Sequence, residues 1–454
     1  MAETPVMLVY HPAQPKDSLG LTSFLFKTLG LSLHEPVTLV WPGQSVVLNP
    51  YLTQSQGNVI HLPSPLAEKL HLPDKCTISV SVNPSSQTLK LKPILAILVS
   101  DLTHPPPFGE LNDFLREVIR YAQKRAVVAY VVTLPELAPC KGPLWGWTYE
   151  ENDWVKRRFP LPHVIYNRIS SRKIERSSLY ATLKKNLAKE QIILFNQTFL
   201  NKWDTYVTLA SQDELKKYLP HTVHFDGRAS LKEMLKKYPV LYLKPVHGSL
   251  GRGIYKLMRA PSGFQVIYNT LAGEMVRYFF SLKSLVVFLS KRIKRPYILQ
   301  EGINLLNVEG GPVDFRVLMQ KNGNGQWQVT SLVARIGGQN QIVSNISRGG
   351  KMARVLPTLK CCGVAHPKEL RSKLASLAKQ AAQTIDQGKG GLFGELGVDL
   401  AVSTQEQIYI LEVNAKPSKT TEALPTQGKK VRPSVRHLVD YTIYLSRLRD
   451  EVEP

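Results

Sequence analysis

Two carboxylates and an amide near the C-terminus have the types and spacing of a metal site. Asp399 lies in one apolar segment, and Glu412 and Asn414 lie in the next, beyond a short polar turn. The pattern predicts a β-hairpin, and alternation along its second strand puts Ile408, Ile410, Glu412 and Asn414 on one face, beside Asp399 of the facing strand. Oxygen donors of this kind suit Mg²⁺ that is shared with phosphates and water. The alternative is that both carboxylates pair with nearby Lys or Arg and serve only the structure.

A lysine followed by a glycine-rich loop is the second chemical signal. Apolar residues from Leu241 lead to Lys244, and Gly248, Gly251 and Gly253 follow before another apolar segment. Because glycine permits positive φ and lets backbone N–H groups approach an anion, such a loop can hold phosphates. The spacing fits neither a Walker loop nor a Rossmann fingerprint. A glycine-rich hairpin that binds nothing is the alternative.

The elements that must position these residues divide the chain into three predicted domains. Residues 1–92 contain short extended segments broken by Pro, Gly, Ser and Asn, which predicts a small β-rich domain. Residues 93–198 alternate apolar runs with helical patterns, which predicts an α/β layer with parallel strands. Residues 199–454 form a second α/β region that closes with helices near 368–385 and 435–448. The expected fold class is α/β with α+β character.

The charge of the chain is strongly basic and unevenly distributed. The formal net charge is +23, yet residues 1–150 contain 11 basic and 11 acidic side chains, so the whole excess lies beyond them. Such a field attracts anions, including nucleotides, acidic peptides, nucleic acid and anionic surfaces. The basic residues are dispersed rather than interleaved with aromatic ones as in nucleic-acid-binding modules, and this disfavours a nucleic-acid partner.

Composition excludes several other classes of protein. Hydrophobic residues at 43% and charged residues at 20% exclude a disordered or collagen-like chain. No apolar stretch approaches the roughly 20 residues of a bilayer span, and the N-terminus lacks a signal-peptide pattern. Four irregularly placed cysteines make neither a disulfide framework nor a pair of zinc knuckles. We therefore expect a cytoplasmic protein without a transmembrane segment.

Taken together, these motifs resemble the ATP-grasp superfamily of carboxylate–amine ligases. More narrowly, the chain resembles the YheC/YheD family of endospore coat-associated proteins of sporulating bacilli. The superfamily resemblance covers about residues 199–425, and the narrower one covers nearly the whole chain, including residues 162–168. It implies an ATP-grasp domain over 199–454, with a small subdomain at about 199–300 and a large subdomain at about 301–454. A Rossmann-like α/β domain and the β-rich N-terminal domain would precede it.

The resemblance also implies a nucleotide site. Lys202 looks like the first ATP lysine and Lys244 like the second, which contacts phosphate oxygens, while the glycine loop forms a lid over the triphosphate. Gln300 and Glu301 match residues that face the adenine edge, and Asp314 matches the acidic residue near the ribose. The implied nucleotide-binding residues are Lys202, Lys244, Gly248, Ser249, Gly251, Gly253, Gln300, Glu301, Asp314 and Asn345, and the implied ligands of two Mg²⁺ ions are Asp399, Glu412 and Asn414.

A further segment bears on catalysis. Residues 344–351 are similar to the Asn-x-x-Arg-Gly-Gly motif of ligases that add amino acids to peptides or proteins, and Arg348 is implied to stabilise the acyl-phosphate transition state. In D-alanine–D-alanine ligases an arginine lies two residues before the first magnesium ligand, where this chain has Gly397. That departure shifts the anion-clamping role to Arg348 or Arg335. The predicted catalytic residues are Arg348, Arg335 and Lys244.

The implied function is an ATP- and Mg²⁺-dependent carboxylate–amine ligase of the peptide type, which acts through an acyl phosphate during spore envelope assembly. Its partners would be ATP, a carboxylate and an amine acceptor such as an amino acid or peptide, together with spore coat components. The coat is then a second expected location. The alternative is a structural endospore coat-associated protein whose ATP-grasp domain binds ATP without turnover. Nucleic-acid binding, with its steep dependence on salt, is the third hypothesis.

Overall fold

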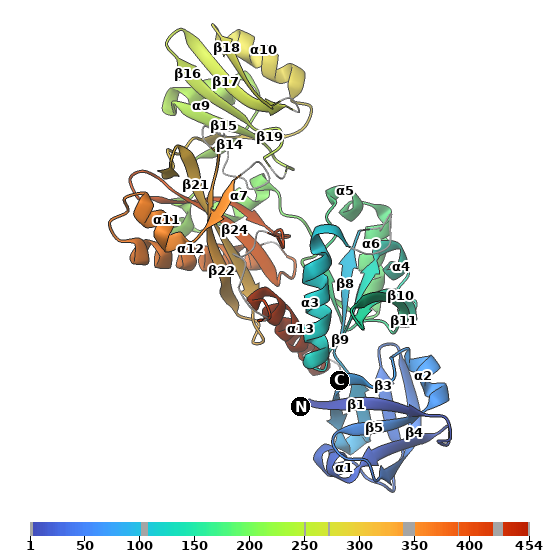
Figure 1. Ribbon diagram of the computed structural model, residues 1–454. Coiled ribbons are helices and arrows are strands. Elements are labelled where there is room, and N and C mark those ends of the chain that lie inside the picture. Colours follow the sequence, from blue (N-terminus) through green and yellow to red (C-terminus); the bar gives the residue numbers. More distant parts are fainter. Residues whose placement is uncertain are drawn as a thin grey trace. The chain divides into compact units, whose positions relative to one another are not determined.

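The structure is a computed structural model that describes residues 3–100, 108–248, 251–270, 273–338, 350–388, 390–420 and 430–452. The chain divides into two compact units (Figure 1). Unit 1 comprises Met1–Gln197, Lys321–Gln326 and Lys429–Pro454, and unit 2 comprises Thr198–Gln320 and Trp327–Gly428. Within the described ranges, no helix combines the length and apolar character that a membrane crossing requires.

Unit 1 begins with a closed β-barrel, whereas the short apolar segments of the N-terminal region predict only a small β-rich domain. The strand order is β1-β5-β2-β4-β3-β7-β6, and pairing of β1 with β6 closes the ring. Leucine and valine side chains from all seven strands fill the interior. The elements are β1 Thr4–His11, β2 Ser18–Thr22, α1 Ser23–Leu29, β3 Val37–Trp41, β4 Gln44–Thr53, β5 Val59–Pro63, α2 Ser64–Leu70, β6 Cys76–Asn83, the 3₁₀ turn η1 Pro84–Ser86 and β7 Thr88–Leu91.

A six-stranded sheet follows in unit 1, with the order β11-β10-β9-β8-β12-β13. Its β9, β8, β12 and β13 are parallel, as the alternation of apolar runs and helical patterns predicts. The elements are β8 Ile94–Val99, η2 Gly109–Leu111, α3 Asn112–Lys124, β9 Val128–Thr133, α4 Leu134–Leu137, β10 Leu144–Glu150, β11 Asp153–Phe159, β12 Val164–Asn167, α5 Arg172–Glu175, α6 Ser178–Lys189 and β13 Ile193–Phe195.

The C-terminal helix α13 (Pro433–Val452) belongs to unit 1. It packs against α3, where Arg125 pairs with Asp440 and Arg432 pairs with Glu117 at 2.8 Å. The sequence indicates this helix within the predicted segment 199–454, and in the structure it packs within unit 1. Its packing partners lie more than 300 residues away in sequence, so only the folded chain shows where it goes.

The first half of unit 2 is a six-stranded antiparallel sheet with the order β14-β19-β15-β16-β17-β18. Apolar residues of α9 and α10, among them Leu231, Leu235 and Leu289, form one core with this sheet. The elements are α7 Lys202–Ala210, α8 Asp213–Lys216, β14 Thr222–His224, α9 Arg228–Lys237, β15 Val240–Pro245, β16 Tyr255–Ala260, β17 Gly263–Thr270, β18 Gly273–Phe279, α10 Leu282–Arg292 and β19 Tyr297–Glu301.

The second half of unit 2 is a sheet with the order β23-β22-β21-β24-β25, to which β20 adds by pairing with β21. Helices α11 and α12 cover one face, so alternate strand residues such as Phe315, Val317 and Val398 enter their core. The opposite face carries the polar residues described below. The elements are β20 Asn307–Val308, β21 Gly311–Lys321, β22 Trp327–Ile336, β23 Lys351–Ala353, α11 Val355–Cys361, α12 Pro367–Gly388, β24 Glu395–Val402 and β25 Ile408–Asn414.

Candidate functional site

The β24–β25 hairpin forms as predicted and brings the three oxygen donors onto one face. Asp399 is directly opposite Glu412, and Gly397 is opposite Asn414. The register shifts after this pair, because Leu400 pairs with Ile410 and leaves an extra residue in β25. The expectation that Ile408 and Ile410 share the face of Glu412 is therefore wrong. Both isoleucines point into the helix-covered core. Because of the extra residue, Glu412 and Asn414 point to the opposite face of the sheet.

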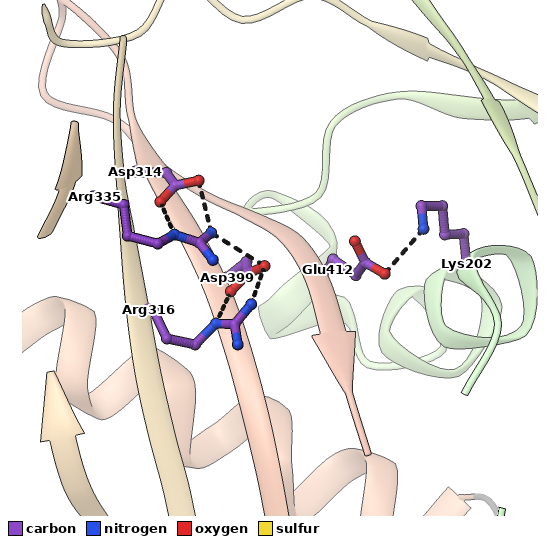
Figure 2. A network of polar contacts seen from close by, with 6 residues as sticks. All are labelled: Lys202, Asp314, Arg316, Arg335, Asp399 and Glu412. Atoms are coloured by element: carbon purple, nitrogen blue, oxygen red, sulfur yellow. Dashed lines mark hydrogen bonds and ion pairs between the residues drawn. The ribbon is translucent and has the colours of Figure 1, made fainter. Parts of the chain in front are cut away.

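Asp399 belongs to a buried network of two carboxylates and two guanidinium groups (Figure 2). Arg316 of β21 binds both of its oxygens, and Arg335 of β22 lies 3.2 Å from Oδ2. Arg335 also binds both oxygens of Asp314, with an Nη2–Oδ2 distance of 2.7 Å. Each of the four side chains is about nine-tenths buried. The network is therefore charge-balanced, as burial of ions requires.

The two arginines keep Asp399 ionised. Burial alone would raise the pKa of the Asp399 carboxyl, but the charges of Arg316 and Arg335 outweigh burial and lower the pKa below its usual value. In turn, Asp399 and Asp314 raise the pKa of Arg335 despite the opposing effect of its burial. Arg335, one of the predicted catalytic residues, is thus a permanent cation that two carboxylates hold in place.

Arg316 is a candidate functional residue that the sequence motifs do not indicate. It lies directly across from Asp399, and its Nη1 would be 3.2 Å from a Cβ at Gly397. Gly397 corresponds to the position at which the resemblance implies an arginine in D-alanine–D-alanine ligases. The neighbouring strand therefore supplies a guanidinium next to the backbone of this residue. Alternation in Asp314-Phe315-Arg316 was the available signal, because it puts the arginine on the same face as Asp314.

Lys202 lies at the beginning of α7 and reaches Glu412 across unit 2 (Figure 2). Asn201 caps the helix by accepting a hydrogen bond from the Asp204 N–H, so the first turn holds the lysine in a defined position. The Lys202 Nζ is 2.9 Å from Glu412 Oε1 and donates to the Gly248 carbonyl at 3.0 Å. This contact joins the first predicted lysine, the glycine loop and a predicted metal ligand.

Lys244 lies near the end of β15 and points toward β19. Its Nζ donates to Gln300 Oε1 at 2.6 Å, and Gln300 Nε2 donates to Thr222 Oγ1 at 3.0 Å. Burial, and then the charge of Lys202, lower the pKa of Lys244 to about 8, although Glu412 acts in the opposite direction. The ammonium is therefore poised to lose its proton slightly above neutral pH.

Lys202, Lys244, Gln300 and Glu412 line one pocket in unit 2. Its walls combine apolar side chains such as Leu219, Ile298 and Leu411 with a polar end made by the two lysines and Glu412. The pocket is narrow. The volume that the centre of a water molecule can occupy is about 30 Å³, which is room for one or two waters. The full lining is Lys202, Thr205, Tyr206, Leu209, Leu219, Pro220, Thr222, Lys244, Ile298, Gln300, Ile410, Leu411, Glu412 and Val413.

Other predicted residues lie apart from this lining. The Glu301 carboxylate accepts a hydrogen bond from the His221 N–H at 3.0 Å, so it holds the neighbouring segment rather than the pocket. Asp314 is occupied by Arg335 in the buried network. In the glycine loop, a Cβ at Gly248 would lie 2.6 Å from Pro245 Cγ, and Gly251 and Gly253 have positive φ. Ser249, Asn345 and Arg348 lie outside the described residues.

The predicted metal ligands meet part of what Mg²⁺ requires. Among the described residues, no group of three or more His, Cys, Asp and Glu side chains could hold a metal ion by itself. Glu412 and Asn414 offer a carboxylate and an amide on one face, and Asp399 is an ionised carboxylate beside them. Because these are hard oxygen donors but few in number, they suit a cation that completes its shell with phosphates and water. Both carboxylates also have basic partners, as the structural alternative requires.

Sequence comparisons relate the chain to known proteins. Residues 191–445 match the family model described as "YheC/D like ATP-grasp". The chain is 28% identical over 386 residues to the endospore coat-associated protein YheD of Bacillus subtilis (strain 168), covering 84% of each chain. It is 24% identical over 267 residues to YheC of the same organism, covering 59% of this chain and 73% of the relative.

Solved structures with lower overall similarity include two ligases. The ATP-grasp ligase PsnB, in a complex with a minimal precursor, has a TM-score of 0.46 and 14% identity, with 77% of this chain and 98% of that chain covered. The VanG D-Ala:D-Ser ligase of Enterococcus faecalis has a TM-score of 0.45 and 12% identity, with 78% and 99% covered.

Proposed function

The chain belongs to the YheC/D-like ATP-grasp family, and from this premise we propose that it is an ATP- and Mg²⁺-dependent carboxylate–amine ligase of the peptide type. In this reaction a substrate carboxylate attacks the γ-phosphorus of ATP, ADP leaves, and an amine then displaces phosphate from the acyl phosphate. Its substrates would be ATP, a carboxylate and an amine, such as amino acids or peptides. The names of its relatives support a role in spore envelope assembly.

One observation carries the proposal: a single pocket joins apolar walls to two lysines and a carboxylate. Apolar side chains of β19 and β25 can bury the flat face of a nucleotide base, because bases expose apolar rings. Lys202 and Lys244 converge at the other end, where a triphosphate would gain charge-assisted hydrogen bonds. The lining thus has a part that suits each half of a nucleotide, and the pocket, which has room for one or two waters as it stands, must widen when a nucleotide binds.

Of the predicted metal ligands, Glu412 lines this end of the pocket, and Asp399 and Asn414 lie on the same face of the β24–β25 hairpin as Glu412. Glu412, Asn414 and Asp399 would hold Mg²⁺, which would offset charge on the β- and γ-phosphates during transfer. Lys202 is already bound to Glu412, and it can exchange this carboxylate for a phosphate oxygen. The protein itself supplies positioning and positive charge, which phosphoryl transfer chiefly requires.

The two buried arginines would orient the reacting carboxylate. Arg316 and Arg335 are planar forks that Asp399 and Asp314 hold in fixed directions. A preorganised cation stabilises developing negative charge without reorganising when the reaction occurs. We retain Arg348 as the residue for the acyl phosphate itself, on the basis of its motif alone. Closure of the glycine loop beside Gly248 would exclude water from the intermediate.

A structural, coat-associated protein that keeps the ATP-grasp fold without turnover is the second candidate. The contacts of both predicted metal-binding carboxylates favour it, since Asp399 is neutralised by two arginines and Glu412 by Lys202. The narrow pocket and the net charge of +23, which suits attachment to an anionic surface, favour it as well.

The two functions differ in ATP turnover. A ligase releases ADP and phosphate only when a carboxylate and an amine are present, for which mixtures of the common amino acids and their dipeptides serve as probes. Glu412→Gln should lower that release at least about 100-fold while the protein stays folded. Glu233→Gln is a matched control, because Glu233 is an exposed carboxylate paired with Lys237 on α9. ADP release that survives Glu412→Gln would contradict the metal assignment, and wild-type protein that releases none with any probe would favour the structural role.

A further inference from the structure

The outer wall of the N-terminal barrel carries a groove that the nucleotide site does not use. Its volume is about 540 Å³, which is within the range of small-molecule sites. It lies on the outside because Leu19, Leu21 and Ile60 fill the barrel core, whereas Gly20 and His61 alternate with them. The groove is lined by His11, Ala13, Gln14, Pro15, Ser18, Tyr51, Thr53 and His61.

A glycine forms the centre of this wall. Gly20 of β2 is paired with Tyr51 of β4 on one side and with His61 of β5 on the other. A Cβ at Gly20 would lie 2.8 Å from each of the His61 Cβ, the Thr53 Cγ2 and the Tyr51 hydroxyl oxygen. The missing side chain therefore lets three polar side chains meet over the sheet. Glycine within a strand is a feature of places where another group approaches the backbone closely.

Three polar atoms among these side chains are buried without a hydrogen-bond partner. They are His61 Nε2, Thr53 Oγ1 and Gln14 Oε1. Gln14 donates from its Nε2 to the Ser18 carbonyl at 3.2 Å and to the His61 carbonyl at 3.1 Å, so its oxygen is left as an acceptor. Buried polar atoms nearly always have partners in folded proteins, so a partner from outside the chain, either a ligand or ordered water, has to reach these three atoms at the groove.

A pair of histidines fixes the chemistry of the groove. His11 Nε2 lies 2.6 Å from His61 Nδ1, so Nε2 is the ring nitrogen with which His61 can meet a ligand, as donor or acceptor according to its tautomer. Burial, and then the charge of His11, lower the pKa of His61 and thus favour its neutral ring. None of the eight lining residues, all of which the structure describes, is Lys, Arg, Asp or Glu.

These properties select one class of ligand. An ionised carboxylate or phosphate cannot donate a hydrogen bond to Gln14 Oε1, and an ammonium would find no carboxylate to balance its charge. A hydroxyl both donates and accepts, and it can therefore pair with Gln14, Thr53 and His61. The Tyr51 ring and Pro15 give an apolar surface beside these atoms. We propose that the groove binds a neutral, hydroxyl-rich ligand, and that a sugar ring is the class that matches it.

Binding of simple sugars to the full chain tests the proposal. The neutral probes are glucose, galactose and N-acetylglucosamine, and the charged probes are glucuronate, glucose 6-phosphate and ethylamine. Saturation-transfer NMR should detect at least one neutral sugar with a Kd on the order of millimolar, and the ¹⁵N signal of His61 Nε2 should shift on titration. Thr53→Val keeps the shape of the side chain but removes the hydroxyl, and it should weaken binding about tenfold.

Two further variants keep the test decisive. Thr28→Val is the matched control, because Thr28 lies on α1 of the same domain and its hydroxyl donates to the Phe24 carbonyl within that helix. Tyr51→Ala removes an exposed wall, should abolish binding, and decides the matter if Thr53→Val does not fold. The proposal is overturned if no neutral sugar binds at about 50 mM, if only a charged probe binds, or if binding is unchanged in Tyr51→Ala. Those results would leave ordered water as the partner of the three atoms.

Discussion

The buried Lys244 side chain should take up a measurable fraction of a proton when a nucleotide binds. Its pKa is lowered to about 8, mainly because the ammonium is buried and secondly because Lys202 is nearby. A triphosphate bound at this end of the pocket would bring negative charge beside the ammonium and raise the pKa again. The free protein therefore loses the proton as the pH rises through about 8, whereas the complex keeps it. Nucleotide binding should take up protons and weaken as the pH rises.

The size of the effect follows from the pKa. A group with a pKa of about 8 is about 90% protonated at pH 7, half protonated at pH 8 and about 10% protonated at pH 9. Binding should thus take up about 0.1, 0.5 and 0.9 protons at these three pH values. Above pH 8 the affinity should fall toward about tenfold per pH unit until the complex also begins to lose the proton.

Calorimetry measures this uptake directly. Binding of Mg²⁺ with the non-hydrolysable analogue AMPPNP is titrated in pairs of buffers whose ionisation enthalpies differ, and the slope gives the protons exchanged. Lys244→Met should abolish the uptake and weaken binding, while Lys237→Met, an exposed lysine of α9, should change neither. Uptake below about 0.1 proton at pH 8, or uptake that persists in Lys244→Met, would refute the reasoning.

Three substitutions probe the polar face of the large sheet. Arg316→Lys loses the planar fork that binds both Asp399 oxygens. ADP release should therefore fall about tenfold or more with little change in Tm. Unchanged kinetics would exclude the orienting role. Gly397→Ala puts a Cβ 2.9 Å from the Pro417 Cβ and 3.2 Å from Arg316 Nη1, so urea unfolding should show a loss of about 1–3 kcal/mol. Lys419→Met leaves Glu395 buried without its ammonium partner and should cost about 3–5 kcal/mol, and a loss below about 1 kcal/mol would count against a buried ion pair.

Local pattern predicted the elements of the site well. The apolar segments around Asp399 and Glu412 form the expected hairpin, and the segment before Lys244 forms the strand that delivers it. These features depend on two-residue alternation and on turn residues, which are visible within ten residues of sequence. The mixed α/β fold class follows from the same patterns and is confirmed.

Features that depend on pairing between distant segments were not predictable in the same way. The bulge at Leu411 reverses the face of Ile410 relative to Glu412, and nothing in the alternation marks the extra residue. Arg316 meets Asp399 because β21 pairs with β24, although the two residues are 83 positions apart in sequence. The groove at Gly20 likewise needs three strands in register before its polar atoms converge.

Diffraction from crystals grown with Mn²⁺ and AMPPNP tests the central claim most directly, since Mn²⁺ replaces Mg²⁺ in oxygen sites and has a measurable anomalous signal. The claim predicts manganese peaks within coordination distance of Glu412 and Asn414, with phosphate oxygens on Lys202 and Lys244 and the base against Ile298 and Leu411. An anomalous map without manganese at this face, or a nucleotide bound elsewhere in the chain, would contradict it.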